Sequence, residues 1–300
     1  MTATVQERPP APTGTPVLSL RGINKRFGAV QALTDVDFDV VMGEVVALVG
    51  DNGAGKSTLV KVMSGVGPAD GGTIEFEGRH VSIPTPHAAQ DLGIATVFQD
   101  LALCDNLDVV GNLYLGREVV RIGALDEVEM ERRSLDLLRQ LAAQLPSVRT
   151  RVAGLSGGQR QVVAISRSLL GEPGLVILDE PTAALGVAQT AQVLNLIERL
   201  RERGLGVVLI SHNLADVFAV ADRIVVLRLG RNGGEFRVGE VDQDDVVAAI
   251  TGSRENVVAE RAARRAGQPE AESPEAEPVE DTDAEHPDAE TPDGAAEEVR

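Results

Sequence analysis

A glycine-rich segment near residue 50 has the residue types and spacing of a phosphate-binding loop. It reads Gly50, Asp51, Asn52, Gly53, Ala54, Gly55, Lys56, Ser57, Thr58. An apolar run precedes it and a helical pattern follows, so backbone N–H groups and a helix N-terminus can surround phosphate oxygens. Lys56 would reach the β- and γ-phosphates of a nucleotide, and the Ser57 hydroxyl would ligate Mg²⁺. The alternative, an ordinary glycine-rich turn, leaves the flanking strand and helix unexplained.

Two adjacent carboxylates, Asp179 and Glu180, directly follow the apolar run Leu175–Leu178. Acids are costly where a buried strand emerges unless they serve a purpose. In a metal and phosphate site, Asp179 would orient the Mg²⁺ shell, and Glu180 would polarise a water for attack on the γ-phosphate. From this segment alone, capping of the next helix by the two acids explains them equally well.

Two more polar side chains end apolar runs: Gln99 follows Ile94–Phe98, and His212 follows Gly206–Ser211. Taken singly, Gln99 can be an ordinary loop amide and His212 a surface imidazole. In an open parallel sheet, however, ligands bind at the carboxyl ends of the strands. We therefore expect five polar side chains to converge at one edge: Lys56, Gln99, Asp179, Glu180 and His212.

The segment LSGGQ at residues 155–159 opens another helical pattern. Ser156 and Gln159 have the spacing of a helix capping box. Capping alone leaves Gly157 and Gly158 unexplained, because adjacent glycines weaken a helix unless a backbone must approach something closely. We interpret the segment as a second phosphate-binding element.

The elements that would position these residues follow from hydrophobic periodicity. Fully apolar runs that alternate with helical patterns predict a parallel sheet covered on both faces. These runs are Val45–Val49, Ile94–Phe98, Leu175–Leu178, Gly206–Ile210 and Arg223–Leu227. Residues 17–44 alternate apolar and polar side chains and predict antiparallel strands, joined by Thr73–Phe76. Residues 127–145 predict a helix with one apolar face, made of Val128, Leu135, Leu138, Ala142 and Leu145.

The expected fold class is α/β. It comprises a P-loop nucleotide-binding domain with a mostly parallel core sheet, an N-terminal antiparallel β subdomain and an inserted α-helical subdomain. We place the domain at residues 17–251 and the helical insertion at about residues 100–168. Residues 1–16 are proline-rich and residues 252–300 are rich in Pro, Glu and Asp, so both are predicted to be disordered.

The composition excludes several classes of function. The chain has 300 residues, 46 acids and 28 bases, for a net charge of −18. Residues 266–300 hold 13 of the acids and one base, which leaves −6 on the rest. This balance opposes nucleic-acid or anionic-membrane binding driven by net charge. With no spanning apolar run and no signal peptide, we expect a soluble, cytosolic chain. The single cysteine excludes an internal disulfide.

The ordered set GDNGAGKST, Gln99, LSGGQ, LVILDEP and His212 resembles the nucleotide-binding subunit of an ABC transporter. The resemblance implies ATP hydrolysis in a dimer, where each ATP lies between one subunit's phosphate loop and the other's signature motif, which is LSGGQ in this chain. It implies that Gln99 links Mg²⁺ to a membrane partner, Asp179 supports the metal, Glu180 is the general base and His212 senses the γ-phosphate. Ser156, Gly157 and Gly158 would serve the opposite ATP. Phe27 would stack on adenine, the alternative being a buried core aromatic.

One position departs from the family. After Asp179-Glu180-Pro181-Thr182, the family usually has Ala-Leu-Asp, and this chain has Gly186 in place of the aspartate, which bears on communication between the two ATP sites. The segments EPTAALGVAQTAQVL and SHNLADVFAVADRI are similar to subunits of bacterial monosaccharide importers of the ribose, xylose and fructose type. Many of those subunits carry two nucleotide domains, and this chain carries one.

The resemblance to importers therefore implies a homodimer. It also implies permease subunits in the membrane, an extracytoplasmic sugar-binding protein, and a place on the inner face of the cell membrane. The alternatives are the ATPase subunit of an exporter, a soluble ABC ATPase, and a non-enzymatic acidic scaffold that would leave the body of the chain unexplained.

Overall fold

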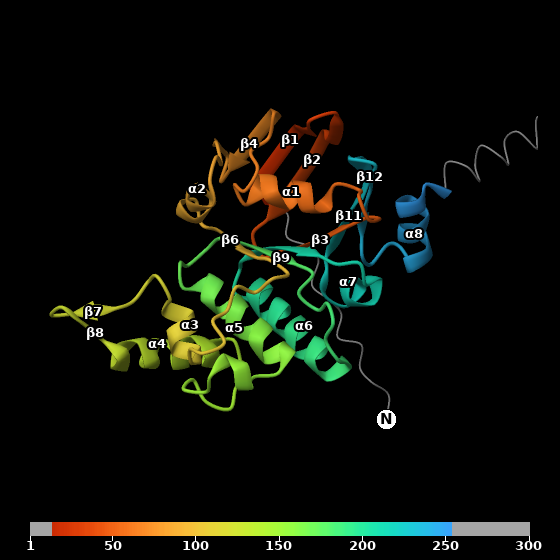
Figure 1. Ribbon diagram of the computed structural model, residues 1–300. Helices are drawn as coiled ribbons and strands as arrows, with labels where there is room; N and C mark the ends of the chain where they lie inside the picture. The colour runs from red at the N-terminus through yellow and green to blue at the C-terminus, as the bar shows by residue number, and fades with distance from the viewer. Residues whose placement is uncertain (1–13, 254–300) are drawn as a thin grey trace, which may run out of the picture. The chain divides into compact units, whose positions relative to one another are not determined.

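The computed structural model describes residues 14–253, and nearly all of the two predicted disordered segments lies outside these residues. A six-stranded sheet lies at the centre, in the order β12-β11-β3-β10-β9-β6 (Figure 1). Its strands are β3 (Val45–Val49), β6 (Ile94–Val97), β9 (Leu175–Asp179), β10 (Gly206–Ile210), β11 (Arg223–Arg228) and β12 (Arg231–Arg237). All are parallel except β12, which pairs antiparallel with β11. The predicted parallel sheet is confirmed.

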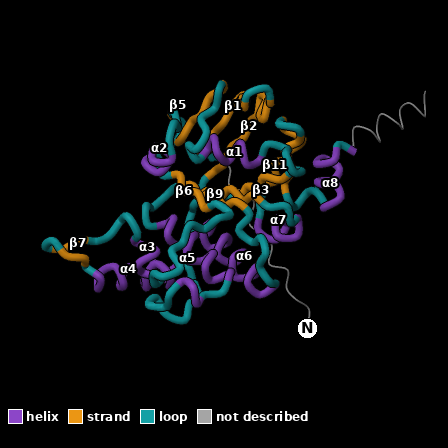
Figure 2. The backbone as a smooth tube through the Cα atoms, viewed as in Figure 1, coloured by secondary structure: helices purple, strands orange, loops and turns teal. Residues whose placement is uncertain are grey.

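Strand β3 shows why an uninterrupted apolar run becomes a central strand. Successive side chains point to opposite faces of a sheet. Val46 and Leu48 pack into the core on the side of α1, whereas Val45, Ala47 and Val49 pack among the helices on the other side. Both faces are covered, with α1 on one and α5 and α6 on the other (Figure 2). A polar residue on either face would be buried, so the run contains none.

A four-stranded antiparallel sheet, in the order β2-β1-β4-β5, packs over the α1 side. Its strands are β1 (Pro16–Phe27), β2 (Val30–Val41), β4 (Gly71–Phe76) and β5 (Arg79–His80). Leu20 lies opposite Phe38 of β2 and opposite Ile74 of β4, as the alternating pattern predicts. The expected antiparallel β subdomain is confirmed.

The helices are α1 (Lys56–Met63), α2 (Pro86–Asp91), α3 (Val109–Tyr114), α4 (Glu127–Gln140), α5 (Gly157–Leu169), α6 (Val187–Glu202), α7 (Leu214–Val220) and α8 (Gln243–Thr251). A 3₁₀ turn spans Val152–Gly154. A short hairpin, β7 (Val120–Arg121) and β8 (Ala124–Leu125), lies between α3 and α4. Across residues 14–253, no helix combines the length and apolar character needed to cross a bilayer.

The predicted helix over residues 127–145 is wrong in two respects. It ends at Gln140, because Ala142 takes a left-handed φ of 48° and its N–H and that of Ala143 turn back to Arg139 and Leu138 carbonyls. This arrangement is a Schellman ending built on alanine in place of glycine. Val128, assigned to the buried face, is 80% exposed.

A buried ion-pair cluster joins the amino ends of β3 and β11, at the edge of the sheet opposite the strand ends that carry the site. Arg223 donates to both oxygens of Glu44, at 2.8 and 3.1 Å, and to Glu235 at 2.8 Å. Burial alone would lower the pKa of Arg223, but the bonds to Glu44 and Glu235 hold it above its usual range. The contact between Arg223 and Glu44 links the amino end of β11 to that of β3.

Candidate functional site

The loop between β3 and α1 has the backbone shape that phosphate binding requires. Gly55 occupies the N-cap of α1 at a left-handed φ of 107°, and no side chain caps the helix. The first N–H groups of α1 therefore have no side-chain acceptor and suit an anion. Gly50 lies so close to β11 that a Cβ on it would come within 2.2 Å of the Leu227 carbonyl oxygen.

Lys56 lies across this loop. Its Nζ donates to the carbonyl oxygens of Gly50, at 2.7 Å, and Asp51, at 3.1 Å. Of the other predicted loop residues, Asn52, Gly53 and Ser57 are exposed, Thr58 is partly buried and Ala54 is buried. The Ala54 N–H donates to the Asp51 carbonyl at 3.1 Å, which closes the turn.

Gly230 lies outside this loop and forms a hydrogen bond to it. The sequence analysis did not single out this residue. Its N–H donates to the Ala54 carbonyl at 2.9 Å, and its carbonyl accepts the Thr34 N–H at 2.8 Å. A Cβ at Gly230 would lie 2.6 Å from the Ala32 carbonyl oxygen. The only signal in the sequence was a leucine-glycine turn between two strands.

Strand register brings the predicted polar side chains to one edge. Ile210 of β10 lies opposite both Leu48 of β3 and Asp179 of β9. The phosphate loop, Glu180 and His212 therefore leave the sheet on neighbouring strands. Gln99 is exposed two residues beyond the end of β6, which lies next to β9. It occupies the same edge, but no hydrogen bond joins it to the other site residues.

Glu180 and His212 form the closest pair in the site. The His212 Nδ1 lies 2.7 Å from the Glu180 Oε2, and the His212 side chain is 70% exposed whereas that of Glu180 is 16% exposed. Glu180 has a left-handed φ of 52°, an arrangement that costs a non-glycine residue about 1–3 kcal/mol and clusters at functional sites. Its N–H donates to the Ile210 carbonyl at 3.0 Å. The strained backbone thus fixes the carboxylate beside the imidazole.

The alternative that the two acids cap the next helix is wrong. Helix α6 begins at Val187, its N-cap is Gly186, and no side chain accepts a bond from its first turn. Gly186 is exposed, so the side-chain position where the family usually has an aspartate faces solvent in this chain.

Asp179 is less acidic than a free aspartate. Burial and the neighbouring Glu180 carboxylate raise its pKa above the ordinary value of 3.8, and Lys56 partly offsets the rise. Because the folded state holds the proton more tightly than the unfolded chain, ionisation of Asp179 destabilises the fold. This destabilisation sets in as the pH rises past 3.8 and is complete above the raised pKa of the folded state.

We expect Asp179→Asn to raise the thermal midpoint of the nucleotide-free protein by a few degrees at pH 7, since the amide removes a half-buried charge. The gain should shrink as the pH falls and should vanish well below 3.8, where Asp179 is protonated in both states. Calorimetry in EDTA measures it, with the exposed Glu202→Gln as a control. A lower midpoint at pH 7 would contradict this account.

The signature motif, LSGGQ at residues 155–159, forms the predicted capping box on α5. The Ser156 Oγ accepts the Gln159 N–H at 3.3 Å, and the Gln159 Oε1 accepts the Ser156 N–H at 3.0 Å. The adjacent glycines also have a packing role that the sequence analysis missed. A Cβ at Gly158 would lie 2.8 Å from that of Gln189 on α6, and one at Gly157 would lie 3.0 Å from Leu185. The glycines therefore let α6 approach α5, and Gly157 remains exposed.

Phe27 ends β1 and is 50% exposed, so its alternative role as a buried core aromatic is wrong. The Lys25 Nζ lies 5.6 Å from the centre of its ring. An exposed ring at this position is free to stack on a planar ligand.

The oxygen atoms that the site offers as ligands suit a magnesium ion that also binds substrate phosphates. Within the part of the chain that the structure describes, no cluster of three or more His, Cys, Asp or Glu side chains could hold a metal alone. Magnesium is usually held through one or two protein carboxylates and completes its shell with other oxygens, chiefly substrate phosphates and waters. A hydroxyl, a carboxylate and an amide, from Ser57, Asp179 and Gln99, match that need.

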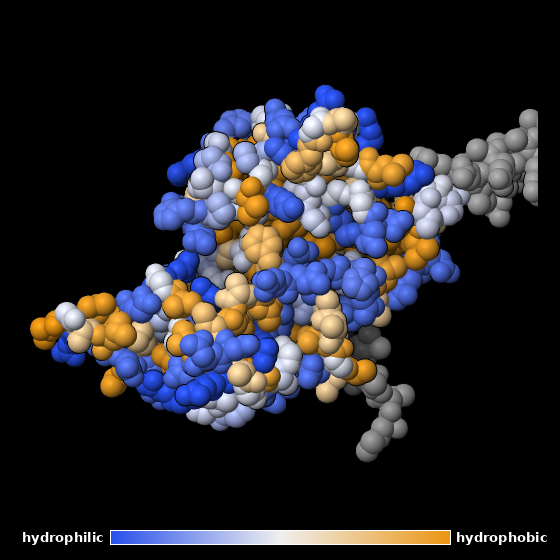
Figure 3. Space-filling view, viewed as in Figure 1, coloured by the Kyte–Doolittle hydropathy of each residue, from blue (hydrophilic) through white to orange (hydrophobic). Residues whose placement is uncertain are grey.

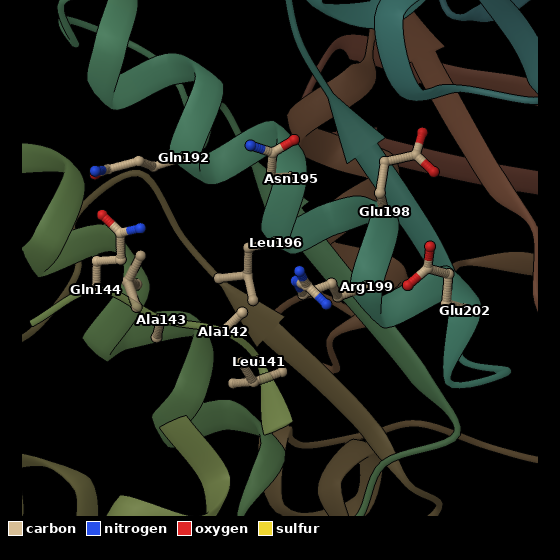
Figure 4. Close-up of a pocket in the computed structure, with 11 residues that line it drawn as sticks. Leu141, Ala142, Ala143, Gln144, Gln192, Asn195, Leu196, Glu198, Arg199 and Glu202 are labelled. Atoms are coloured by element: carbon tan, nitrogen blue, oxygen red, sulfur yellow. The ribbon is translucent and has the colours of Figure 1, made fainter. Parts of the chain in front are cut away.

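A separate cavity of about 380 Å³ lies between α6 and the segment that follows α4 (Figure 4). Gln192, Asn195 and Glu198 of α6 line it opposite Ala143 and Gln144. None of the predicted site residues lines this cavity, so it takes no part in the chemistry described above.

Comparisons with known proteins agree with this geometry. The ABC transporter family matches residues 33–183. The fructose import ATP-binding protein FrcA of Rhizobium meliloti is 44% identical over 80% of this chain and 95% of its own length. The xylose/arabinose import ATP-binding protein XylG of Sulfolobus acidocaldarius is 42% identical over 78% and 94%. The ribose import ATP-binding protein RbsA 1 of Rubrobacter xylanophilus is 41% identical, and this chain covers 50% of it.

Solved structures give the same result. An ATP-binding cassette of an ABC transporter in its ADP conformation is 26% identical, with a TM-score of 0.68 over 79% of this chain and 96% of that one. A dimeric cassette in a post-hydrolysis state with ADP and Pi gives a TM-score of 0.62 at 25% identity, over 74% of this chain and 98% of that one.

The chain belongs to the ABC transporter family. Within that family it is an ATP-binding subunit, and it hydrolyses ATP. The expected fold class and the expected enzyme activity are both confirmed.

Proposed function

We propose that this subunit powers the import of a monosaccharide through a membrane permease. The observation that carries the proposal is the near full-length similarity to the fructose and xylose/arabinose import ATP-binding proteins, which this chain covers to 95% and 94%. These two relatives are single-cassette chains of similar size. The longer relative from Rubrobacter xylanophilus is a ribose import protein, and ribose is a third sugar of the same class.

In the proposed reaction, Lys56 and the first N–H groups of α1 hold the phosphates of ATP. Glu180 accepts a proton from the water that attacks the γ-phosphorus, and the bond between that phosphorus and the bridging oxygen to the β-phosphate breaks. The hydrogen bond from His212, at 2.7 Å, holds the Glu180 carboxylate in place. Phe27 stacks on the adenine. Ser57, Asp179 and Gln99 would hold Mg²⁺, which when bound offsets the negative charge of the phosphate oxygens.

The proposed working unit is a homodimer with two ATP molecules. This chain supplies one phosphate loop and one signature motif, so two composite sites need two copies. Ser156, Gly157, Gly158 and Gln159 of one copy would contact the ATP held by the other. The dimeric ADP-bound cassette supports such an arrangement.

Gln99 links each site to the permease in this proposal. It is exposed at the end of β6, beside a groove of about 360 Å³ lined by Phe98, Leu101 and Leu115. The subunit would thus lie at the cytoplasmic face of the membrane. An extracytoplasmic sugar-binding protein would deliver the sugar from the other side.

The test is reconstitution of the chain with a permease and a sugar-binding protein encoded in the same genome. We expect fructose, xylose or ribose, together with the binding protein, to raise ATP hydrolysis several-fold and to enter proteoliposomes in the import direction. Lys56→Ala serves as the inactive control. Transport of substrate in the opposite direction would favour an exporter. A rate of ATP hydrolysis that is the same with and without the permease would favour a soluble ABC ATPase.

A further inference from the structure

The β7–β8 hairpin presents an apolar tip to solvent. Val120, Ile122 and Leu125 are 61%, 98% and 56% exposed, and the neighbouring Val128 is exposed as well. Figure 3 shows apolar side chains gathered on the projection where Figure 1 draws β7 and β8. Single exposed apolar residues need no explanation, but three on one short hairpin, with a fourth at the start of α4, mark an interaction surface.

The turn of this hairpin also places Ile122 in an unfavourable backbone conformation. Ile122 and Gly123 both have positive φ, at 53° and 79°, as in a type I′ turn. That turn favours Asn-Gly, and a β-branched residue in a left-handed conformation is a true outlier. Ile122 is therefore both strained and almost fully exposed. Neither property helps the isolated subunit to fold.

The groove beside Gln99, which meets the permease in the proposed function, precedes the hairpin along the chain. The groove beside Gln99 is lined by Phe98 and Leu115, which are both exposed apolar side chains, and by Arg117. Strand β7 begins only three residues after Arg117. Of the 13 large apolar side chains exposed in the described part of the chain, six lie between residues 98 and 128. We call these six side chains, which follow one another along the chain from the groove to the hairpin and the start of α4, the apolar strip.

The charge on the strip favours a protein over a lipid surface. Residues 115–128 contain two arginines and three acids, so the segment carries no basic surplus. Binding to an anionic bilayer relies on clusters of lysine and arginine beside the apolar residues. An apolar pocket on a protein makes no such demand.

We infer that the β7–β8 hairpin is a second docking element for the permease, and that Ile122, with Val120 and Leu125, inserts into an apolar pocket on its cytoplasmic face. This inference rests on the proposed function, because the groove at Gln99 is the first docking element. The hairpin would fix the helical segment of the subunit to the same partner.

The test compares the unaltered chain with an Ile122→Asn/Leu125→Thr variant. Asn-Gly is the preferred sequence for this turn, so the variant should fold at least as well. Binding is measured to inside-out vesicles of the native membrane, stripped of peripheral proteins with urea. We expect about tenfold weaker binding or more, from the loss of two buried apolar side chains. ATP hydrolysis without membranes should not change.

Leu229→Asn is the matched control. Leu229 is 80% exposed and, like Ile122, has a left-handed φ and precedes a glycine in a two-residue turn, here between β11 and β12. It lies outside the strip, so its loss should leave vesicle binding unchanged. A variant at Ile122 and Leu125 that binds as tightly as the unaltered chain would overturn the inference.

Two further measurements separate the other possible occupants. If the unaltered chain binds protein-free liposomes of the same lipids and the variant does not, the tip binds lipid and the inference is wrong. If the variant instead loses self-association in solution, the tip binds a second copy, and the inference is again wrong. Failure of the unaltered chain to bind stripped vesicles would overturn the proposed function as well, which distinguishes it from failure of the hairpin alone.

Discussion

Glu180→Gln should bind ATP as the unaltered chain does and lose steady-state hydrolysis by about 100-fold or more. The amide keeps the size of the side chain, and its oxygen can still accept a hydrogen bond from His212, which lies 2.7 Å from the carboxylate. The amide cannot accept the proton of the attacking water. The dimer should therefore persist with ATP, which size-exclusion chromatography with and without ATP detects.

The control for this substitution is Glu202→Gln, which removes the charge of an exposed carboxylate on α6. It should hydrolyse ATP at the unaltered rate. If Glu180→Gln keeps hydrolysis within about threefold of the unaltered chain, a positioned base worth two orders of magnitude is absent, and the assignment of Glu180 is wrong.

Ser156→Arg should abolish steady-state hydrolysis while leaving ATP affinity of the isolated monomer unchanged. The substitution places a long cationic side chain at the start of α5, at the surface that would meet the partner's ATP. It also removes the cap on Gln159 N–H, at a cost of about 1 kcal/mol in folding stability. Ser156→Thr, which keeps the hydroxyl and the cap, should remain active. Weakened ATP binding by the Ser156→Arg monomer would mean that the segment serves its own nucleotide.

Much of the fold follows from patterns that depend on burial. Strands β3 and β10 are apolar on both faces because both faces are covered, and β1 alternates because one of its faces meets solvent. The end of α4 could not be predicted in this way. Ala142 takes the left-handed position that glycine normally marks, so the sequence carried no stop signal. The hairpin after α3 is too short and too exposed to show a periodic pattern.

The site, like the fold, could be predicted from the sequence only in part. The spacing of the phosphate loop and the polar ends of β9 and β10 predicted which side chains meet, because parallel strands end at one edge. The left-handed backbone of Glu180 could not be predicted, since it is imposed by the contact of its N–H with Ile210 in a neighbouring strand. The fit of Gly158 against Gln189 likewise depends on how two helices pack, which no local pattern reveals.

The central claim is that each ATP is shared between two copies of the chain. Two heterodimers, purified through different tags on their subunits, test it directly. In the first, one subunit carries Ser156→Arg and the other carries Lys56→Ala. Composite sites would place both changes at the same ATP and leave the second site intact. In the second heterodimer, one subunit carries both changes and its partner is unaltered, so composite sites would each contain one change.

The measurement is single-turnover ATP hydrolysis by the two heterodimers at equal concentration, after their thermal midpoints have been shown to agree. This account predicts that the first heterodimer hydrolyses up to one ATP per dimer and that the second hydrolyses none. Sites contained within one subunit predict the reverse, because only the second heterodimer has an intact chain. Hydrolysis by the second heterodimer and none by the first would contradict the shared-site account.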